Sequence, residues 1–136
     1  MTDEKDKKII EALRKNARAR NVDIAAAVAM TEGAVRARIS RLLKNGIIRK
    51  FTIETSEEDT NMAVVMVKAK RNTKSMMHDI LRLRLARNAY EIAGEYDCCL
   101  ILEDSDISSI DKKIDKLRTL KTVMDTKTFI VMRGWV

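Results

Sequence analysis

Three arginines stand close together between residues 32 and 44, and their chemistry suits the recognition of phosphate and of guanine. Arg36, Arg38 and Arg41 each carry a planar guanidinium. This group can donate two parallel hydrogen bonds to O6 and N7 of guanine, or it can pair with a phosphate oxygen. Apolar residues recur at helical spacing along the same stretch, so a helix that buries them turns the basic residues outward. The pattern therefore indicates contact with double-stranded DNA.

A second short helix and a tight turn are predicted immediately before this basic helix. Apolar residues at helical spacing run up to Val28, the sequence Ala29-Met30-Thr31 interrupts them, and Val35 resumes the pattern. Thr31 is expected to cap the basic helix, and Asn45-Gly46 is expected to end it. Two short helices joined by a tight turn, of which the second is basic and exposed, have the shape that fits the DNA major groove.

The residues expected at the DNA interface are grouped by their distance from the apolar stripe. Arg36, Ala37 and Ser40 lie furthest from that stripe and are predicted to read bases. Basic residues on either side are predicted to contact phosphates. The other members of the predicted interface are Thr31, Glu32, Arg38, Arg41, Lys44, Arg18, Arg20, Arg49 and Lys50. The alternative is a solvated basic face without a specific partner.

The charge distribution favours a nucleic-acid partner for the first part of the chain. The 136 residues carry a formal net charge of +7. Residues 1–54 hold 13 lysines and arginines against 7 acidic residues, whereas residues 55–136 hold 14 against 13. A polyanion is therefore expected to bind the first part only.

The remaining composition argues against an enzyme, a metal site and a membrane protein. His78 is the only histidine and is expected to be exposed, and the adjacent Cys98 and Cys99 are expected to pack rather than react. The sequence has no metal-ligand spacing and no glycine-rich phosphate loop, so no cofactor is expected. No apolar run reaches 18 residues, and neighbouring cysteines in a strand are poorly placed for a disulfide. These features predict a protein of the reducing cytoplasm.

Hydrophobic periodicity divides the chain into two predicted domains, residues 1–54 and residues 62–136. The first begins with a helix over residues 3–16 and ends, after the two helices described above, with a linker strand over residues 47–54. Residues 56–61 are acidic and polar and are predicted to contain the boundary. The first half is therefore predicted to be a helix-turn-helix domain of winged-helix-like type.

The second half is predicted to alternate strands and helices. The expected order is strand, helix, strand, strand, helix, strand, which is the ferredoxin-like βαββαβ arrangement and makes the whole chain an α+β protein. The strands are expected at residues 62–69, 89–93, 98–103 and 123–133, and the helices at residues 75–85 and 107–120. Such a sheet has helices on one face only. Its other apolar face needs a cover, and a second copy of the chain is the simplest one.

Together the two halves resemble the Lrp/AsnC family of transcriptional regulators, also called feast/famine regulators. In the first half the resemblance rests on Asp3-Glu4-Lys5-Asp6, Leu13 to Arg18, Ile24-Ala25, Thr31, Val35, Arg38, Leu42 and Gly46-Ile47-Ile48. In the second half it rests on Gly94 to Asp97, and on Val123 with Thr126 and Thr128. The match implies that Arg38 holds the DNA backbone or braces the fold.

Two positions depart from the family pattern, which usually has glycine there. They are Ala29, in the turn between the two short helices, and Thr122, just before the last strand. A residue with a Cβ at position 29 is strained if the turn needs a positive φ. Neither change removes a functional group.

The resemblance also implies a small-molecule effector, typically a free amino acid. The effector region would comprise Gly94, Glu95, Tyr96 and Asp97 in one turn, with Thr126, Thr128 and Phe129 on the last strand. Asp97 could accept a hydrogen bond from the α-ammonium, and turn amides could donate to the carboxylate. The simpler interpretation is a hairpin turn in which Asp97 bonds its own backbone.

The sequence as a whole predicts a cytoplasmic, nucleoid-associated transcriptional regulator, a homodimer or an octamer, whose affinity for DNA answers to an amino acid. Two alternatives are left open. One is an architectural DNA-binding protein of the same fold without an effector. The other is a small-molecule-binding enzyme subunit with an incidental helix-turn-helix, against which the lack of a nucleophile, base or metal cluster counts.

Overall fold

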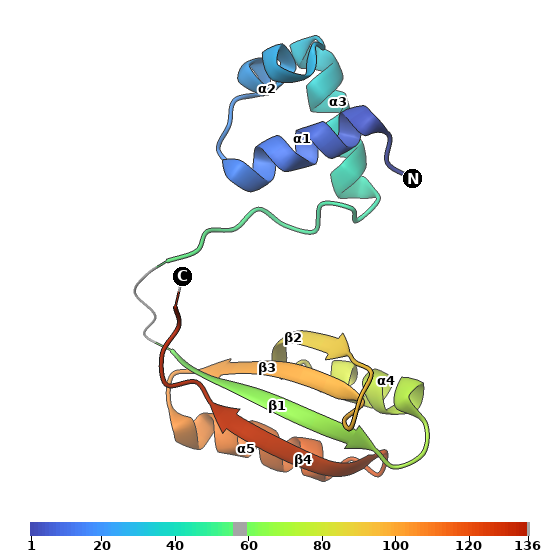
Figure 1. The fold of residues 1–136 in the computed structure, drawn as a ribbon, viewed down its shortest axis with the longest axis vertical. Coiled ribbons are helices and arrows are strands. Elements are labelled where there is room, and N and C mark those ends of the chain that lie inside the picture. Colours follow the sequence, from blue (N-terminus) through green and yellow to red (C-terminus); the bar gives the residue numbers. More distant parts are fainter. Residues whose placement is uncertain (56–59, 136) are drawn as a thin grey trace. The chain divides into compact units, whose positions relative to one another are not determined.

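The chain folds into two compact units, Met1–Thr55 and Ser56–Val136, in the computed structural model (Figure 1). The structure describes residues 1–55 and 60–135. The first unit is helical and the second is an antiparallel sheet with helices, so the predicted α+β class is confirmed. The boundary predicted within residues 56–61 falls largely on residues 56–59, which lie outside the described residues.

Residues 1–55 form three helices around a small apolar core. The helices are α1 (Glu4–Lys15), α2 (Asn21–Val28) and α3 (Glu32–Lys44). Each contributes one apolar stripe, and the buried side chains are Ile9, Leu13, Ile24, Ala25, Val28 and Val35. α1 starts where predicted because Asp3 and Asp6 cap it together. The Asp3 carboxylate accepts a hydrogen bond from the Asp6 N–H (2.8 Å), and the Asp6 carboxylate accepts one from the Asp3 N–H (3.2 Å).

The turn between α2 and α3 places Ala29 in the left-handed region. Its φ and ψ are 54° and 56°, and its N–H donates to the Ala25 carbonyl where α2 ends. The turn thus imposes a positive φ on a residue that carries a Cβ. Thr31 then caps α3 as predicted, since its hydroxyl accepts a hydrogen bond from the Ala34 N–H (3.2 Å).

The predicted linker strand over residues 47–54 is wrong. The N–H groups of Ile47 and Ile48 turn back and donate to the Leu42 carbonyl (2.9 and 3.1 Å), which closes the end of α3. Residues 49–55 then continue outside any strand. Their β-branched side chains favour an extended backbone, but a strand also needs a neighbour that completes its hydrogen bonds. Among the described residues, no strand pairs with this segment.

The second unit has the predicted ferredoxin-like arrangement. Its elements are β1 (Asn61–Ala69), α4 (Thr73–Leu83), β2 (Ala86–Glu91), β3 (Cys98–Asp104), α5 (Ile107–Arg118) and β4 (Val123–Ile130). The strands lie in the order β2-β3-β1-β4, and each neighbouring pair is antiparallel. β2 lies earlier than the strand predicted over residues 89–93. It ends at Glu91 because the Ile92 N–H turns to donate to the Asp97 carbonyl (3.0 Å) and closes the hairpin loop.

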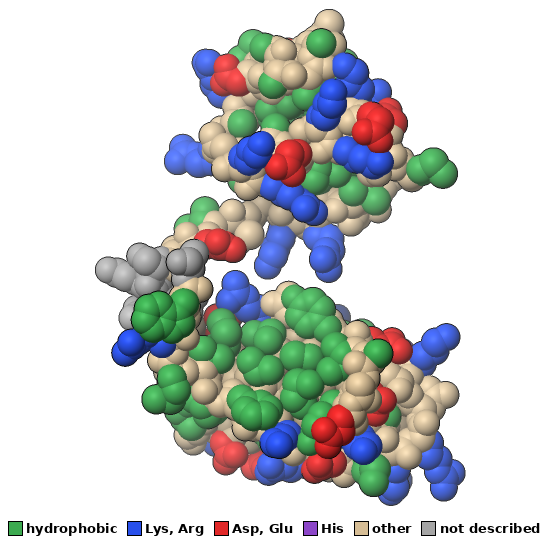
Figure 2. Space-filling view, viewed as in Figure 1, with side chains coloured by type: hydrophobic (Ala, Val, Ile, Leu, Met, Phe, Trp, Pro, Cys, Tyr) green, Lys and Arg blue, Asp and Glu red, His purple; other side chains and the backbone are tan. Residues whose placement is uncertain are grey.

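The sheet has one covered face and one open face. α4 and α5 pack on the face to which Ala63, Val65, Leu100 and Leu102 contribute fully buried side chains. On the opposite face the strand register brings together six side chains that we call the open sheet face: Val64, Met66, Tyr90, Cys99, Ile101 and Phe129. Figure 2 shows hydrophobic side chains gathered over the sheet of this unit.

Replacing Ala29 with glycine should stabilise the first unit by about 0.5–1 kcal/mol. Glycine adopts a positive φ without the steric cost borne by Ala29, and this gain exceeds the extra freedom of glycine in the unfolded chain. Urea denaturation followed by helical circular dichroism measures the change. Ala27→Gly is the matched control, because the same substitution inside α2 should destabilise the unit by about 1 kcal/mol. A loss of stability in both variants would show that the turn does not strain Ala29.

Candidate functional site

The outward face of α3 carries the residues predicted to read bases. Arg36, Ala37 and Ser40 are all exposed on it. The Arg36 guanidinium pairs with the Glu32 carboxylate one turn earlier, and their side chains remain 65% and 47% exposed. An exposed pair at this spacing is weak, so Arg36 stays available to a partner that offers better acceptors.

One buried carboxylate, in contrast, holds Arg38 and Arg41. Asp6 of α1 is 1% exposed, and its Oδ1 accepts hydrogen bonds from Arg38 and Arg41, each at 2.9 Å. The same Arg41 nitrogen also donates to Oδ2 of Asp6 (2.9 Å), and Arg38 donates to Asp3 (2.6 Å). α1 is thereby fastened to α3 by charge as well as by packing.

This network favours the charged form of both carboxyl groups. Burial raises the pKa of Asp6, but hydrogen bonds from Arg38 and the Asp3 N–H, with the charge of Arg41, outweigh burial and leave that pKa below its usual value near 3.8. The hydrogen bond from Arg38, followed by that from the Asp6 N–H, lowers the pKa of Asp3. Arg38 therefore braces the fold, which is one of the two roles implied for it. Contact between Arg38 and DNA stays a prediction.

The residues predicted to contact phosphates are exposed on the same unit. Arg20 is engaged by Asp23 in an ion pair of 2.9 Å. The others have no ion-pair partner among the described residues, and they are Arg18, Lys44, Arg49 and Lys50. These four cations are therefore free to bind a phosphate group, and their contact with DNA stays a prediction.

The Gly94–Asp97 turn is fastened to β1 through Asp97. The Asp97 N–H donates to the Val67 carbonyl (3.0 Å), and Oδ2 of Asp97 accepts a hydrogen bond from the Ala69 N–H (2.7 Å). Gly94 has a φ of 145°, which favours glycine. Asp97 thus bonds the backbone of a neighbouring strand rather than its own. Its Oδ1 has no hydrogen-bond partner within residues 1–55 and 60–135.

The three effector residues predicted on β4 do not share one face of the sheet. Thr126 and Thr128 lie on the helix-covered side, whereas Phe129 belongs to the open sheet face. Arg118 of α5 donates to the Thr126 hydroxyl (3.3 Å), and Thr128 Oγ1 is buried without a hydrogen-bond partner among the described residues. A ligand on one side of the sheet can therefore reach only part of this set.

The cysteine and acidic side chains form no reactive cluster in the described part of the chain. No group of three or more His, Cys, Asp or Glu side chains is placed there to hold a metal ion. Burial raises the pKa of the Cys98 thiol to about 11, so the thiol stays protonated and packs against the core. Among the described residues, no helix is long and apolar enough to cross a membrane.

Sequence reasoning missed the role of Asp6, although a signal was present. Asp6, Ile9 and Leu13 fall on one stripe of α1, and all three are buried. An acidic residue within a buried stripe needs cationic partners, which α3 supplies. The same reasoning also missed a hollow beside the start of α4, because loops far apart in the sequence form it.

Sequence comparison finds matches to two family models. Residues 2–49 match a model described as winged helix-turn-helix DNA-binding, and residues 62–136 match the Lrp/AsnC ligand binding domain. The fold and the exposed basic helix therefore define the class of this protein as a DNA-binding transcriptional regulator with a ligand-binding domain. Within that class, the chain belongs to the Lrp/AsnC family, as its sequence resemblance implied.

Named relatives support the same assignment. The HTH-type transcriptional regulator LysM of Sulfurisphaera tokodaii is 41% identical over 135 residues, which is 98% of this chain and 96% of that protein. LysM of Saccharolobus solfataricus is 37% identical, with coverage of 98% and 95%. These relatives are regulators rather than enzymes.

Solved structures show the same fold. Escherichia coli AsnC has a TM-score of 0.70 at 22% identity and covers 100% of this chain and 95% of its own. A Neisseria meningitidis transcriptional regulator in complex with L-methionine has a TM-score of 0.73 at 22% identity, with coverage of 98% and 91%.

Replacing Asp6 with asparagine should destabilise the first unit by about 2–3 kcal/mol at neutral pH. The change removes the negative charge that Arg38 and Arg41 share at a buried position, while the side-chain volume is nearly kept. Chemical denaturation measures the loss. Glu4→Gln is the matched control, since Glu4 pairs with Lys7 at the exposed surface and its change should have little effect. Equal effects of the two substitutions would contradict the role of the network.

The pH dependence of the same variant provides a second readout. The pKa values of Asp3 and Asp6 are lower in the folded than in the unfolded chain. Their contribution to stability is therefore complete above the unfolded value near 3.8 and is lost as the pH falls through the folded values. Wild type should lose stability below about pH 4, and Asp6→Asn should lose less over the same range. Thermal unfolding in a series of acidic buffers compares the two.

Proposed function

We propose that the chain binds specific sites in double-stranded DNA through α3 and regulates transcription from the nucleoid, in the cytoplasm, in answer to an amino acid. The observation that carries this proposal is the outward face of α3, where Arg36, Ala37 and Ser40 are exposed on a helix that Asp6 fastens to α1. A recognition helix has to be held firmly to read base edges. This helix is held by packing and by charge.

Arg36 is the proposed base reader. Its pair with Glu32 holds the guanidinium along the helix face, yet the pair is exposed enough for a nucleobase to replace the carboxylate. O6 and N7 of guanine accept two hydrogen bonds from one guanidinium, so Arg36 would discriminate at one base position. Phosphate contacts fix the position of such a helix on the duplex without reading sequence. The residues proposed for them are Arg18, Lys44, Arg49 and Lys50.

A second copy of the chain is the proposed partner of the open sheet face. Apolar side chains gathered on one side of a sheet are unfavourable in water, and a two-fold related copy offers the same surface in return. The proposed assembly is a homodimer, which presents two α3 helices to a two-fold symmetric DNA site, with an octamer as its larger form. Sedimentation at micromolar concentration tests the dimer, and a folded monomer would exclude it.

An amino acid bound beside the Gly94–Asp97 turn is the proposed effector. Two structural neighbours, the Neisseria meningitidis regulator and a feast or famine regulatory protein from Mycobacterium tuberculosis, were solved in complex with L-methionine. In this chain Oδ1 of Asp97 is available to accept a hydrogen bond from an α-ammonium. Exposed turn amides would donate to the ligand carboxylate. The ligand would act by favouring the arrangement of subunits that binds it more tightly.

An architectural DNA-binding protein without an effector is the second candidate, and one observation favours it. The Asp97 carboxylate already accepts a hydrogen bond from the Ala69 N–H (2.7 Å), which gives this residue a purely structural use. Titration of the full chain with free amino acids separates the two candidates, because only an effector-binding protein gains thermal stability from the ligand.

Arg36→Ala should weaken binding to a specific DNA site by about 1–3 kcal/mol and relax preference at one base position. Lys50→Ala is the matched control, because loss of a phosphate contact should weaken binding to all sequences alike and reduce the salt dependence. Binding isotherms on selected and scrambled duplexes at several salt concentrations measure both effects. Equal, sequence-independent losses in the two variants would remove Arg36 from the base-reading set.

Asp97→Asn should lower the affinity for the amino-acid effector about 10–150-fold while basal DNA binding stays nearly unchanged. Asparagine keeps an oxygen that can accept from the Ala69 N–H, so the turn is retained and only the charge offered to the ammonium is lost. Calorimetry across the common amino acids measures the affinity. Asp111→Asn, which removes the same charge from the exposed surface of α5, is the control. Unchanged affinity in Asp97→Asn would place the pocket elsewhere.

A further inference from the structure

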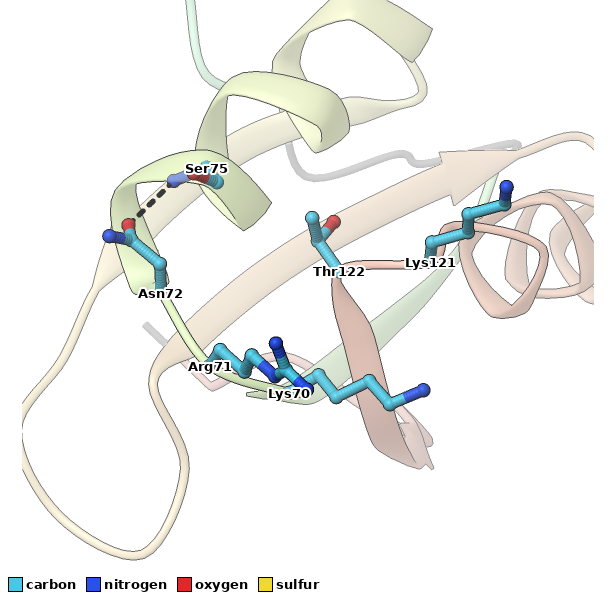
Figure 3. Close-up of a pocket in the computed structure, with 6 residues that line it drawn as sticks. All are labelled: Lys70, Arg71, Asn72, Ser75, Lys121 and Thr122. Atoms are coloured by element: carbon cyan, nitrogen blue, oxygen red, sulfur yellow. Dashed lines mark hydrogen bonds between the residues drawn. The ribbon is translucent and has the colours of Figure 1, made fainter.

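A hollow of about 420 Å³ lies beside the start of α4, in the second unit. It is lined by the end of the β1–α4 connection, the first turn of α4 and the α5–β4 connection. The lining residues are Lys70, Arg71, Asn72, Ser75, Lys121 and Thr122. Figure 3 shows Lys70 and Arg71 extending from one loop, and Lys121 and Thr122 on the other. The volume falls within the range of small-molecule sites in proteins.

Within the described part of the chain, the lining of this hollow carries three positive charges and no negative one. Residues 55–136 as a whole are nearly balanced, with 14 basic against 13 acidic residues, so the three cations are a local concentration and not a property of the unit. Among the described residues, Lys70, Arg71 and Lys121 have no ion-pair partner. Like charges in one hollow repel one another, and a bound anion relieves that repulsion.

Two carboxylates close to the hollow already accept hydrogen bonds from the chain. The Asp79 carboxylate accepts a hydrogen bond from the Thr122 hydroxyl (2.8 Å), and the Asp97 carboxylate accepts one from the Ala69 N–H (2.7 Å). Neither residue lines the hollow. The three cations are therefore left for a negative group from outside the chain.

Hydrogen bonds hold the frame of the hollow in place before any ligand arrives. The Lys70 N–H donates to the Thr122 carbonyl (2.9 Å), which joins the two loops that carry the cations. The Asn72 side chain accepts a hydrogen bond from the Ser75 N–H (3.0 Å), drawn as a dashed line in Figure 3. Only the long side chains of Lys70, Arg71 and Lys121 have to move to close on a ligand.

We propose that this hollow binds a small multivalent anion, in which two or more phosphate or carboxylate groups are held by Arg71, Lys70 and Lys121. Arginine supplies a fork that matches the oxygens of either group, and the lysines add point charges. A zwitterionic amino acid has one carboxylate and one ammonium, and the lining residues supply no negative charge to pair with the ammonium. The site therefore goes beyond the proposed amino-acid effector and takes a ligand of different charge.

The test uses the full chain with pyrophosphate and with glutarate as probes, at ionic strength matched with sodium chloride. Each probe that binds should raise the thermal midpoint of the second unit by about 6–11 °C at ten times its Kd. In Arg71→Gln/Lys121→Gln the affinity should fall about 100-fold, since two charge-assisted contacts are lost. A response to pyrophosphate alone or to glutarate alone identifies the anion class and supports the site.

Two matched double variants remove the same charge elsewhere. Lys112→Gln/Lys116→Gln changes exposed cations of α5, and Arg49→Gln/Lys50→Gln changes cations of the first unit. Both should bind the probes as wild type does. The proposal is overturned if neither probe acts beyond the matched salt, if Arg71→Gln/Lys121→Gln binds normally, or if Arg49→Gln/Lys50→Gln abolishes binding. Circular dichroism without ligand checks that each variant is folded.

Discussion

Taking a carboxylate out of water costs several kcal/mol unless cations and hydrogen bonds replace its hydration. Asp6 meets that condition through Arg38 and Arg41, and both arginines come from α3. The helices α1 and α3 therefore cannot separate without leaving an unpaired charge in the core. Because Arg38 and Arg41 must reach Asp6, they fix which side of α3 faces α1 and therefore which side faces outward.

Much of the architecture follows from local pattern. The apolar spacing around Val35 and Leu42 located α3, and the apolar run in residues 62–69 located the central strand. The failures have one physical origin, which is that they depend on partners distant in the sequence. Residues 47–54 have strand-forming side chains but no strand beside them, and β2 ends early because Ile92 bonds across the loop to Asp97. A sequence pattern indicates which secondary structure a residue favours. Whether that structure forms depends on hydrogen-bond partners that are distant in the sequence.

The predicted site residues also differ in whether local sequence pattern is enough to place them. The exposure of Arg36, Ala37 and Ser40 could be predicted from helical spacing alone, and their contact with bases stays a prediction. The roles of residues that depend on a partner distant in the sequence could not be predicted from spacing. Sequence spacing indicates no partner for Asp6, yet its carboxylate is buried and binds two arginines of α3. Lys70, Arg71 and Lys121 belong to no recognisable sequence motif. The pairing of β1 with β4 brings their loops together.

The hydrogen bond from the Ala69 N–H to the Asp97 carboxylate means that hydrogen exchange at this amide can report ligand binding at the turn. Ala69 lies where the pairing of β1 with β4 shifts register, and its amide proton is held by a side chain rather than by the sheet. A ligand whose cation pairs with the Asp97 carboxylate weakens the hydrogen bond from the Ala69 N–H. The Ala69 amide proton then exchanges faster with solvent. A ligand that binds elsewhere leaves the exchange rate as it was. Isotope labelling at this one position would thus register occupancy of the turn without any DNA present.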